Sequence, residues 1–309
     1  MKNIEISVVV PLFNEEEVVR ETSRKLADAL GQLTDSFEII FVDDGSQDKT
    51  ISIVNEILKD GSGNFKLIEL SRNFGKESAL AAGMEAALGE AVLFIDADMQ
   101  HPIELIPQMV SLWRSGHEVV NAVKRTRGKE SFVYRLFSSA FNQILSSSTN
   151  RDMVGASDYK LLDRQVVDVL KTFTEQHRFF RGLVAWVGFK SVDVQFDVAE
   201  RYAGQSRWTS WSLILYSLRC LVGFTSLPLR LVAFTGFFTV TVGVILLLQT
   251  LANYFSGNAA IGFTTVIAVQ ILLGGMTIFS VGVVAIYLSY MHDESKRRPI
   301  FVVRRPSRR

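Results

Sequence analysis

Short apolar segments alternate with longer amphipathic segments over the first 125 residues of the chain. The pattern predicts strands at residues 4–10, 37–42, 66–70, 91–95 and 119–123. It predicts helices at residues 15–33, 77–88 and 103–115, and a further helix that Asp48 caps and that runs to Leu58. Strands that alternate with helices in this way are typical of an α/β domain with a doubly wound, mostly parallel sheet. Polar residues follow the first, second and fourth strands, so they are expected to meet at one sheet edge.

The pattern changes completely after Arg230. None of the 62 residues between Arg230 and Asp293 (293 − 230 − 1) is Asp, Glu, Lys or Arg. Two apolar runs, at 231–251 and 265–288, are each long enough at ~1.5 Å per residue to cross a hydrocarbon core of ~30 Å. The alternative is a buried helical hairpin in a soluble protein, which would be extracted without detergent. Two such runs in tandem favour a transmembrane hairpin over 229–292.

A stretch ahead of the hairpin has a different periodicity. Apolar residues recur there every three or four positions, at Trp208, Trp211, Leu215, Leu218 and Val222. This spacing predicts an amphipathic helix at the membrane interface, within an interfacial region of 208–228, and a core helix is the alternative. The predicted organisation is therefore a catalytic domain at 1–207, the interfacial region, the hairpin, and a tail at 293–309.

Charge sets the expected orientation in the membrane. The chain has 33 basic and 32 acidic residues, so no overall field indicates a nucleic acid partner. The tail from residue 293 carries seven basic and two acidic residues, which leaves the other 292 residues at −4. Because the positive-inside rule places such flanks in the cytoplasm, we expect a multi-pass plasma-membrane protein whose termini and catalytic domain are cytoplasmic. No signal peptide is recognised, and the single Cys220 fits a reducing compartment.

The fourth predicted strand ends in a cluster of oxygen-bearing side chains. Asp96, Asp98 and Gln100 alternate directly after the apolar run 91–95. Such oxygen ligands suit a hard cation, so they form a candidate Mg²⁺ or Mn²⁺ site. The alternative is that the two acids belong to a loop or cap a helix, since an isolated Asp-x-Asp is common.

Two familiar phosphate-binding motifs are missing from the sequence. Gly75-Lys76 has Leu70 where a P-loop needs its first glycine, and no Gly-x-Gly-x-x-Gly follows the first strand. A bound diphosphate would therefore be neutralised by a metal and by arginines. Basic loops at 124–129 and 201–208 are candidates for this role, although each taken alone is better explained as a solvated surface turn.

Several of these motifs occur together in one known family. The chain resembles the family 2 glycosyltransferases of the nucleotide-sugar-binding fold GT-A, and in particular the polyprenyl-phosphate glycosyltransferases, which include dolichol-phosphate mannose synthase and the bactoprenol glucosyltransferases. The resemblance covers nearly the whole chain, and its two C-terminal spans are similar to those of the bacterial branch. It rests on Val9–Glu16, Val42–Ser46, Arg72–Lys76, Asp96–Pro102 and Arg201–Arg207.

The resemblance implies roles for individual residues. The expected nucleotide-sugar pocket comprises Pro11, Phe13, Glu15, Val42, Asp44, Asp96, Ala97 and Asp98. Asp44 would accept a hydrogen bond from the base, Asp96 and Asp98 would flank the diphosphate, and Asp98 with Gln100 would hold the metal. Arg125, Arg201 and Arg207 would meet phosphates, although the family usually has lysine where Arg207 stands. Asp98 and Asp158 are the expected catalytic residues, and Asp158 matches the acid often proposed as the base.

The expected reaction is inverting transfer of one sugar from a nucleotide-sugar, first of all UDP-glucose, to undecaprenyl or another polyprenyl phosphate. A phosphomonoester has a second pKa of about 6 and is mostly dianionic at neutral pH. We therefore expect Asp158 to orient the acceptor or its arginines rather than to remove a proton.

Two other functions are weighed against this one. A processive polysaccharide synthase would carry Gln-x-x-Arg-Trp and more spans, whereas Gln205-Ser206-Arg207-Trp208 is one residue too short. An inactive membrane scaffold would have lost the metal acids or the arginines, which are all present. Small residues along the spans could also pack helices within one chain or between the chains of a homo-oligomer: Gly236, Gly243, Gly274, Gly275 and Gly282.

Overall fold

The computed structural model describes residues 4–60, 64–125, 155–197, 226–256 and 262–304. The chain divides into two compact units, Met1–Ser217 with Arg298–Arg309, and Leu218–Arg297. The described residues 298–304 thus belong to the same unit as the described residues 4–197. Predictions for 126–154 and for 198–225, including the amphipathic helix, fall outside the described residues.

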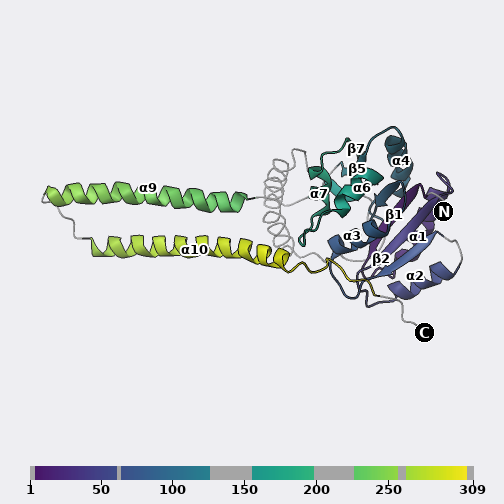
Figure 1. The fold of residues 1–309 in the computed structure, drawn as a ribbon, viewed down its shortest axis with the longest axis horizontal. Coiled ribbons are helices and arrows are strands. Elements are labelled where there is room, and N and C mark those ends of the chain that lie inside the picture. The colour runs from purple at the N-terminus through teal and green to yellow at the C-terminus, as the bar shows by residue number, and fades with distance from the viewer. Residues whose placement is uncertain (1–3, 61–63, 126–154, 198–225, 257–261, 305–309) are drawn as a thin grey trace. The chain divides into compact units, whose positions relative to one another are not determined.

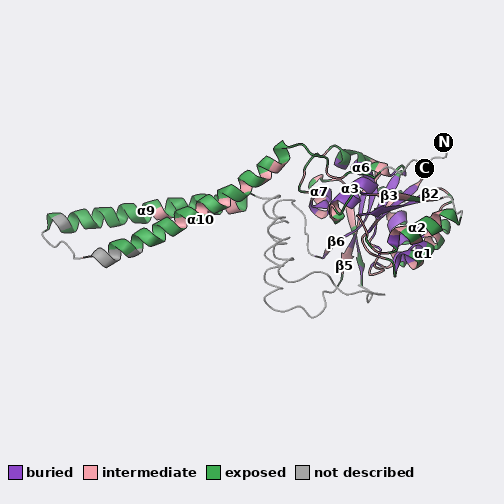
Figure 2. Cartoon of the chain, turned by 90° about the horizontal axis from the view of Figure 1, so that it is seen from below, coloured by how far each residue is buried: buried purple, intermediate pink, exposed green. Residues whose placement is uncertain are grey.

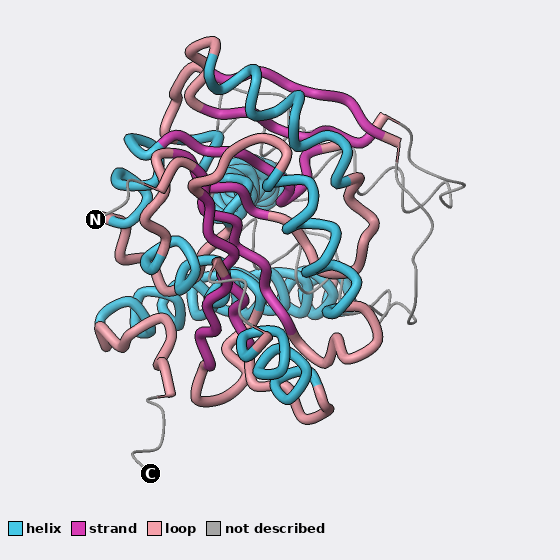
Figure 3. The backbone as a smooth tube through the Cα atoms, turned by 90° about the vertical axis from the view of Figure 1, so that its right-hand side faces the viewer, coloured by secondary structure: helices cyan, strands magenta, loops and turns pink. Residues whose placement is uncertain are grey.

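The first unit is built on a seven-stranded sheet with the strand order β3-β2-β1-β4-β6-β5-β7 (Figures 1 and 3). Its strands are β1 (Ile6–Leu12), β2 (Phe37–Asp43), β3 (Phe65–Glu69), β4 (Ala91–Phe94), β5 (Val119–Lys124), β6 (Ala156–Asp163) and β7 (Ser191–Phe196). All strand pairs are parallel except the two that β6 makes, with β4 and with β5. Because β6 runs in the opposite direction, its first residues lie at the edge where the other strands end.

Helices follow most of the strands. They are α1 (Val19–Gly31), α2 (Thr50–Lys59), α3 (Lys76–Ala86), the 3₁₀ turn η1 (Ile103–Leu105) with α4 (Ile106–Arg114), α6 (Arg164–Lys171) and α7 (Phe180–Trp186). The element order confirms the predicted α/β class with a doubly wound, mostly parallel sheet. Each predicted strand and helix in the described part of residues 1–125 is present, with its ends shifted by a few residues.

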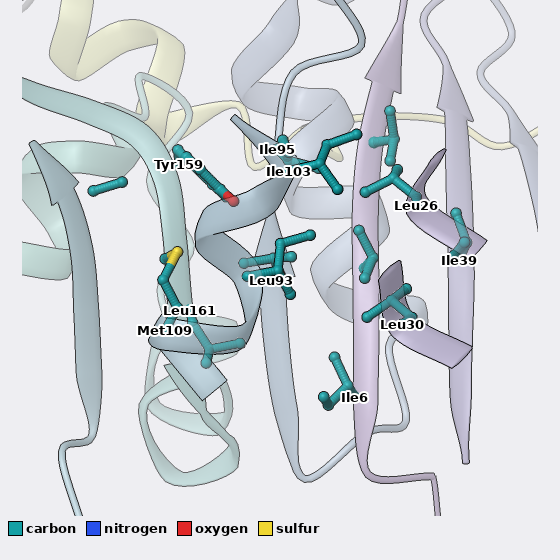
Figure 4. Packing of buried hydrophobic residues seen from close by; sticks show 14 of the residues in the cluster. Ile6, Leu26, Leu30, Ile39, Leu93, Ile95, Ile103, Met109, Tyr159 and Leu161 are labelled. Atoms are coloured by element: carbon teal, nitrogen blue, oxygen red, sulfur yellow. The ribbon is translucent and has the colours of Figure 1, made fainter. Parts of the chain in front are cut away.

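The core lies between the sheet and its helices. Central strands β1 and β4 are buried along almost their whole length, as expected of strands covered on both faces. Figure 2 shows buried residues, in purple, concentrated in the sheet. Figure 4 shows part of the apolar cluster, with Leu26 and Leu30 of α1 over the strands that carry Ile6 and Ile39. On α3, a Cβ atom at Gly83 would lie 2.2 Å from Val9 Cγ1, so this glycine lets the helix approach the sheet closely.

Strands β6 and β7 were not predicted from the sequence. The sequence indicated only an acid after a glycine turn at 155–160, whereas Ala156–Asp163 is a buried strand inserted between β4 and β5. Its run of polar and charged residues, Ser157, Asp158 and Lys160, hides the apolar signature of a central strand. All three are nevertheless buried, because partners from neighbouring elements satisfy them.

The described part of the second unit consists of two long apolar helices, α9 (Leu227–Phe255) and α10 (Phe263–Ser295). Spans of 27 residues in each, Leu227–Asn253 and Val269–Ser295, are long and apolar enough to cross a membrane, and their described residues are exposed or only partly buried. The helices lie side by side, and Thr239 Oγ1 donates a hydrogen bond to Met276 Sδ (2.8 Å) (Figure 1). The glycines of these helices have open space around them, so a role in packing between chains stays a prediction.

Candidate active site

The loops after β1 and β2 are joined to each other by hydrogen bonds. The Asn14 N–H donates to Ser46 Oγ (2.8 Å), and the Glu15 N–H donates to Thr50 Oγ1 (2.8 Å). Asn14 has a φ of 54° and accepts the Gln47 N–H at its Oδ1 (2.7 Å). These bonds hold the predicted pocket residues around Phe13 and Glu15 against the end of β2.

The loop after β3 is fastened to the end of β2 by Asp44. Its two carboxylate oxygens accept the N–H groups of Phe74 (2.7 Å) and Gly75 (2.9 Å). Burial raises the pKa of Asp44, and these two donors only partly oppose the effect. A Cβ atom at Gly45, whose φ is +77°, would lie 2.7 Å from the Asn73 nitrogen, so only glycine fits where the two loops cross.

Asp43, one residue earlier, was assigned no role in the sequence analysis. Its Oδ2 accepts the N–H groups of Gly45 and Ser46, each at 3.0 Å, and so shapes the turn. Its Oδ1 is buried and has no hydrogen-bond partner among the described residues. The carboxylate of Asp43 is therefore a second acceptor group at the end of β2, beside Asp44.

The turn after β4 presents Asp98 and Gln100 at the same edge of the sheet. Met99 has a φ of 58°, and Asp98 Oδ1 accepts the Gln100 N–H (3.1 Å), which closes a tight turn. Both side chains are partly exposed. Behind the turn, the buried His101 stacks on Tyr159, with 5.1 Å between ring centroids, and the Tyr159 hydroxyl donates to Pro102 O (3.1 Å). This aromatic support fixes the position of the turn from β6.

Four charged side chains from four different elements meet beside this turn. Lys76, at the start of α3, places its Nζ 2.6 Å from Asp96 Oδ1 and 2.7 Å from Asp158 Oδ2. Arg181 of α7 binds both oxygens of Asp158, from Nε (2.6 Å) and Nη2 (2.9 Å). Asp158, near the start of β6, is therefore held by two cations and is almost fully buried.

These contacts set the ionisation of the cluster. Burial alone would raise the pKa of Asp158, but Lys76 and Arg181 hold it well below the usual value. Burial also opposes ionisation of Asp96, yet the Lys76 cation keeps the pKa of Asp96 lowered. The two carboxylates in turn raise the pKa of Lys76 despite its own desolvation. All four groups are therefore charged at neutral pH, and their formal charges sum to zero.

Glu77 adjoins this cluster and behaves differently. Burial, together with the nearby charge of Asp158, raises the pKa of Glu77 from 4.5 to about 7, although the Phe180 N–H donates to its Oε2 (2.8 Å). The folded state thus binds this proton more tightly than the unfolded chain does. By proton linkage, the contribution of Glu77 to folding stability declines as the pH rises from 4.5 to about 7.

Replacing Glu77 with Gln is therefore expected to remove part of the pH dependence of stability. At pH 8 the Glu77→Gln variant should melt roughly 7–14 °C above the parent protein, and most of this difference should be lost by pH 5. Thermal unfolding in detergent from pH 5 to 8 measures this. Glu85→Gln, at an exposed position of the same helix, is the control and should follow the parent curve. If the melting temperature changed equally with pH in Glu77→Gln and in the parent protein, Glu77 would not have a raised pKa in the folded state.

Comparison with known proteins identifies the family. The sequence model of Glycosyl transferase family 2 matches residues 7–170, more than half of the chain. The chain belongs to glycosyl transferase family 2. Its relatives include the uncharacterized glycosyltransferase YkcC of Bacillus subtilis, 36% identical over 98% of this chain and 94% of that protein. The prophage bactoprenol glucosyl transferase homolog of Escherichia coli is 32% identical over 98% of this chain and 99% of that protein.

A further relative and a solved structure are also similar to this chain. The bactoprenol glucosyl transferase of Shigella phage SfV is 32% identical over 97% of this chain and 98% of that protein. Among solved structures, glucosyl-3-phosphoglycerate synthase of Mycobacterium tuberculosis has a TM-score of 0.49 at 21% identity, over 71% of this chain and 76% of that one. The sequence matches confirm the predicted family and establish that the protein is a glycosyltransferase.

Most of the described residues that were predicted to form the site of this glycosyltransferase lie at one edge of the sheet. Phe13, Glu15, Asp44, Asp96, Asp98 and Gln100 come from loops at one edge of the sheet, as does Pro11 at the end of β1. Val42 and Ala97 differ, because both residues are buried in the core, and Ala97 O accepts a hydrogen bond from Thr22 Oγ1 (2.9 Å). Arg125 is exposed and pairs with Asp197 (3.3 Å). Arg201 and Arg207 lie outside the described residues.

Sequence reasoning missed two cations that the glycosyltransferase places closest to its acidic residues. Lys76 stands in the quoted motif Arg72–Lys76 but was assigned no role. Arg181 had no signal at all, since it follows two phenylalanines in a segment without clear periodicity. Only the packing of α7 against β6 brings Arg181 to Asp158, 23 residues earlier in the chain.

The turn after β4 of this glycosyltransferase fits a divalent cation. Among the described residues no three His, Cys, Asp or Glu side chains are grouped to hold a metal. Asp98 and Gln100 nevertheless provide a carboxylate and an amide oxygen, which are hard ligands. Mg²⁺ is commonly bound by one or two carboxylates, and substrate phosphates and water complete its coordination. Asp96 contacts Lys76 instead, so Asp98 and Gln100 are the better candidates.

Proposed function

We propose that the protein transfers one sugar from a nucleotide-sugar to a polyprenyl phosphate at the cytoplasmic face of the plasma membrane. The observation that carries the proposal is the meeting of Lys76, Asp96, Asp158 and Arg181 at the edge of a family 2 domain whose chain continues into two apolar helices. The relatives named bactoprenol glucosyl transferases support undecaprenyl phosphate as acceptor and glucose as sugar. UDP-glucose is accordingly the first donor to test.

The donor would lie across the loops that follow β1, β2 and β4. Phe13 and Glu15 would flank the nucleoside, and Asp44 would accept a hydrogen bond from the base. Asp98 and Gln100 would hold Mg²⁺ or Mn²⁺, which stabilises the charge that develops on the nucleoside diphosphate when the bond to the sugar breaks. Arg125, Arg201 and Arg207 are the proposed phosphate contacts.

The acceptor phosphate oxygen would attack C1 from the face opposite the leaving group, so the anomeric configuration inverts. Asp158 is a poor candidate for a base in this step, because Lys76 and Arg181 hold its pKa well below the usual value. We assign it instead the positioning of these two cations. A dianionic phosphate needs no deprotonation, so the chemistry does not require another base.

The course of the chain supports the proposed membrane arrangement. The hairpin leaves the catalytic unit before Leu218 and re-enters it at Arg298. Both ends of the hairpin are therefore tied to one folded unit, which requires them to be on the same side of a membrane. The seven basic residues of the tail favour the cytoplasmic side.

The proposal is tested with protein purified in detergent, undecaprenyl phosphate and a panel of sugar nucleotides, with Mn²⁺ or EDTA, and with mass spectrometry of the lipid. The expected product is the lipid carrying a single hexose, and EDTA should abolish its formation. Long products would favour a processive synthase. An inactive membrane scaffold would bind no nucleotide in the presence of Mg²⁺ or Mn²⁺. Such a result in a nucleotide-binding measurement would overturn the proposal.

A further inference from the structure

The C-terminal segment returns to the sheet and pairs with its edge strand. Leu70 and Val303 form an antiparallel bridge directly after β3. The Ser71 N–H donates to Val302 O (2.8 Å), and the Arg304 N–H donates to Glu69 O (2.7 Å). The segment 299–304 thus begins an additional strand beside β3, on the far side from β2 (its yellow trace can be followed in Figure 1).

Backbone groups make this contact. The side chains of Val302 and Val303 are each 45% exposed, so burial of apolar surface contributes little there. Gln176 donates a hydrogen bond to the carbonyl of Arg298, the residue that precedes this segment. An extended segment that pairs its backbone with an open sheet edge binds by strand addition, which also protects that edge.

The paired residues lead directly into the loop that holds Asp44. Ser71 is the first residue of the loop 71–75, whose backbone at Arg72 and Asn73 crosses closely over Gly45. The loop ends at Phe74 and Gly75, whose N–H groups bind the Asp44 carboxylate. A continuous series of backbone contacts therefore connects the tail, beyond the membrane hairpin, with a predicted nucleotide-binding residue.

We propose that segment 299–304 is a positioning element of the donor site, which holds loop 71–75 and thereby the Asp44 carboxylate in the orientation needed to bind a nucleotide. The nucleotide part of this inference rests on the proposed function. Its consequence is that the segment on the C-terminal side of the hairpin contributes to donor affinity.

Two variants and a matched control test the proposal in the full-length protein in detergent. One variant ends the chain after Arg298. The second, Arg304→Pro, removes the N–H that donates to Glu69, whereas the control Arg304→Ala removes the same charge but keeps that N–H. The readouts are hydrogen exchange of peptides covering Phe74 and Gly75, and the Kd for UDP.

Loss of one backbone hydrogen bond is expected to speed exchange at Phe74 and Gly75 about fivefold in Arg304→Pro. The truncation should speed it at least about tenfold, because it removes both bonds. The Kd for UDP should rise by similar factors, and Arg304→Ala should match the parent protein. Unchanged exchange at Phe74 and Gly75 in the truncated chain would overturn the proposal.

If hydrogen exchange in the variants were accelerated in peptides of β1 as much as at Phe74 and Gly75, the variants would have lost stability globally. This would refute a local positioning role. Alternatively, hydrogen exchange at Phe74 and Gly75 could be faster in the variants while the parent protein binds no nucleotide. This result would establish the contact between the tail and loop 71–75 and refute the proposed function instead.

Discussion

Replacement of Asp98 by Ala is expected to reduce sugar transfer by about 10³-fold or more while the domain stays folded. Asp98 lies in the turn after β4, where its side chain is partly exposed and bears a carboxylate suited to a divalent cation. Its loss removes a metal ligand and so the stabilisation of charge on the leaving diphosphate. Formation of lipid-linked hexose at saturating Mn²⁺, measured by mass spectrometry, gives the rate.

A second substitution at the same position separates charge from local structure. Asp98 Oδ1 also accepts the Gln100 N–H, so Asp98→Ala disturbs the turn as well as the metal site. Asp98→Asn keeps an oxygen that can accept this N–H but removes the charge. We expect Asp98→Asn to lose almost as much activity as Asp98→Ala. Near-normal activity in Asp98→Asn would show that Asp98 only shapes the turn and would remove it from the metal site.

Replacement of Asp158 by Asn is expected to lower kcat/KM by about 10²-fold or more without changing the form of the pH–rate profile. The change leaves Lys76 and Arg181 facing a neutral amide, so Arg181 loses its ionic partner and Lys76 keeps only Asp96. Breaking a fully buried ion pair on one side costs roughly 3–5 kcal/mol, and the cost here is smaller because both cations are more than a third exposed. Assays are therefore run below the melting temperature of the variant.

The pH profile distinguishes a positioning residue from a base. Because Lys76 and Arg181 hold the pKa of Asp158 well below its usual value, Asp158 remains ionised from pH 5 to 9. The acidic limb of the profile should follow the acceptor phosphate, with a pKa of about 6, in both the parent and Asp158→Asn. Disappearance of that limb in the variant would instead identify Asp158 as the base. Asp168→Asn, at an exposed ion pair of α6, is the control and should match the parent protein.

Much of the fold follows from local patterns. The apolar runs of β1, β2 and β4 are nearly continuous because helices cover both faces of these strands, and such runs are visible in the sequence. The two apolar helices are visible for a related reason, since the 62 residues between Arg230 and Asp293 include no Asp, Glu, Lys or Arg. Strand β6 was missed because partners far away in the sequence satisfy its buried Asp158 and Lys160.

In the candidate site, too, some features follow from local sequence patterns and others depend on contacts between distant residues. Local sequence patterns show that acidic and polar residues end several parallel strands, so the meeting of Asp44, Asp96 and Asp98 at one edge can be predicted from them. The identity of the cations that pair with the acids depends on long-range packing. Lys76 and Arg181 come from helices 105 residues apart (181 − 76), and no local periodicity encodes their convergence on Asp158. The pairing of Val303 with Leu70 is equally non-local, because a backbone contact of an exposed segment leaves no pattern in the side chains.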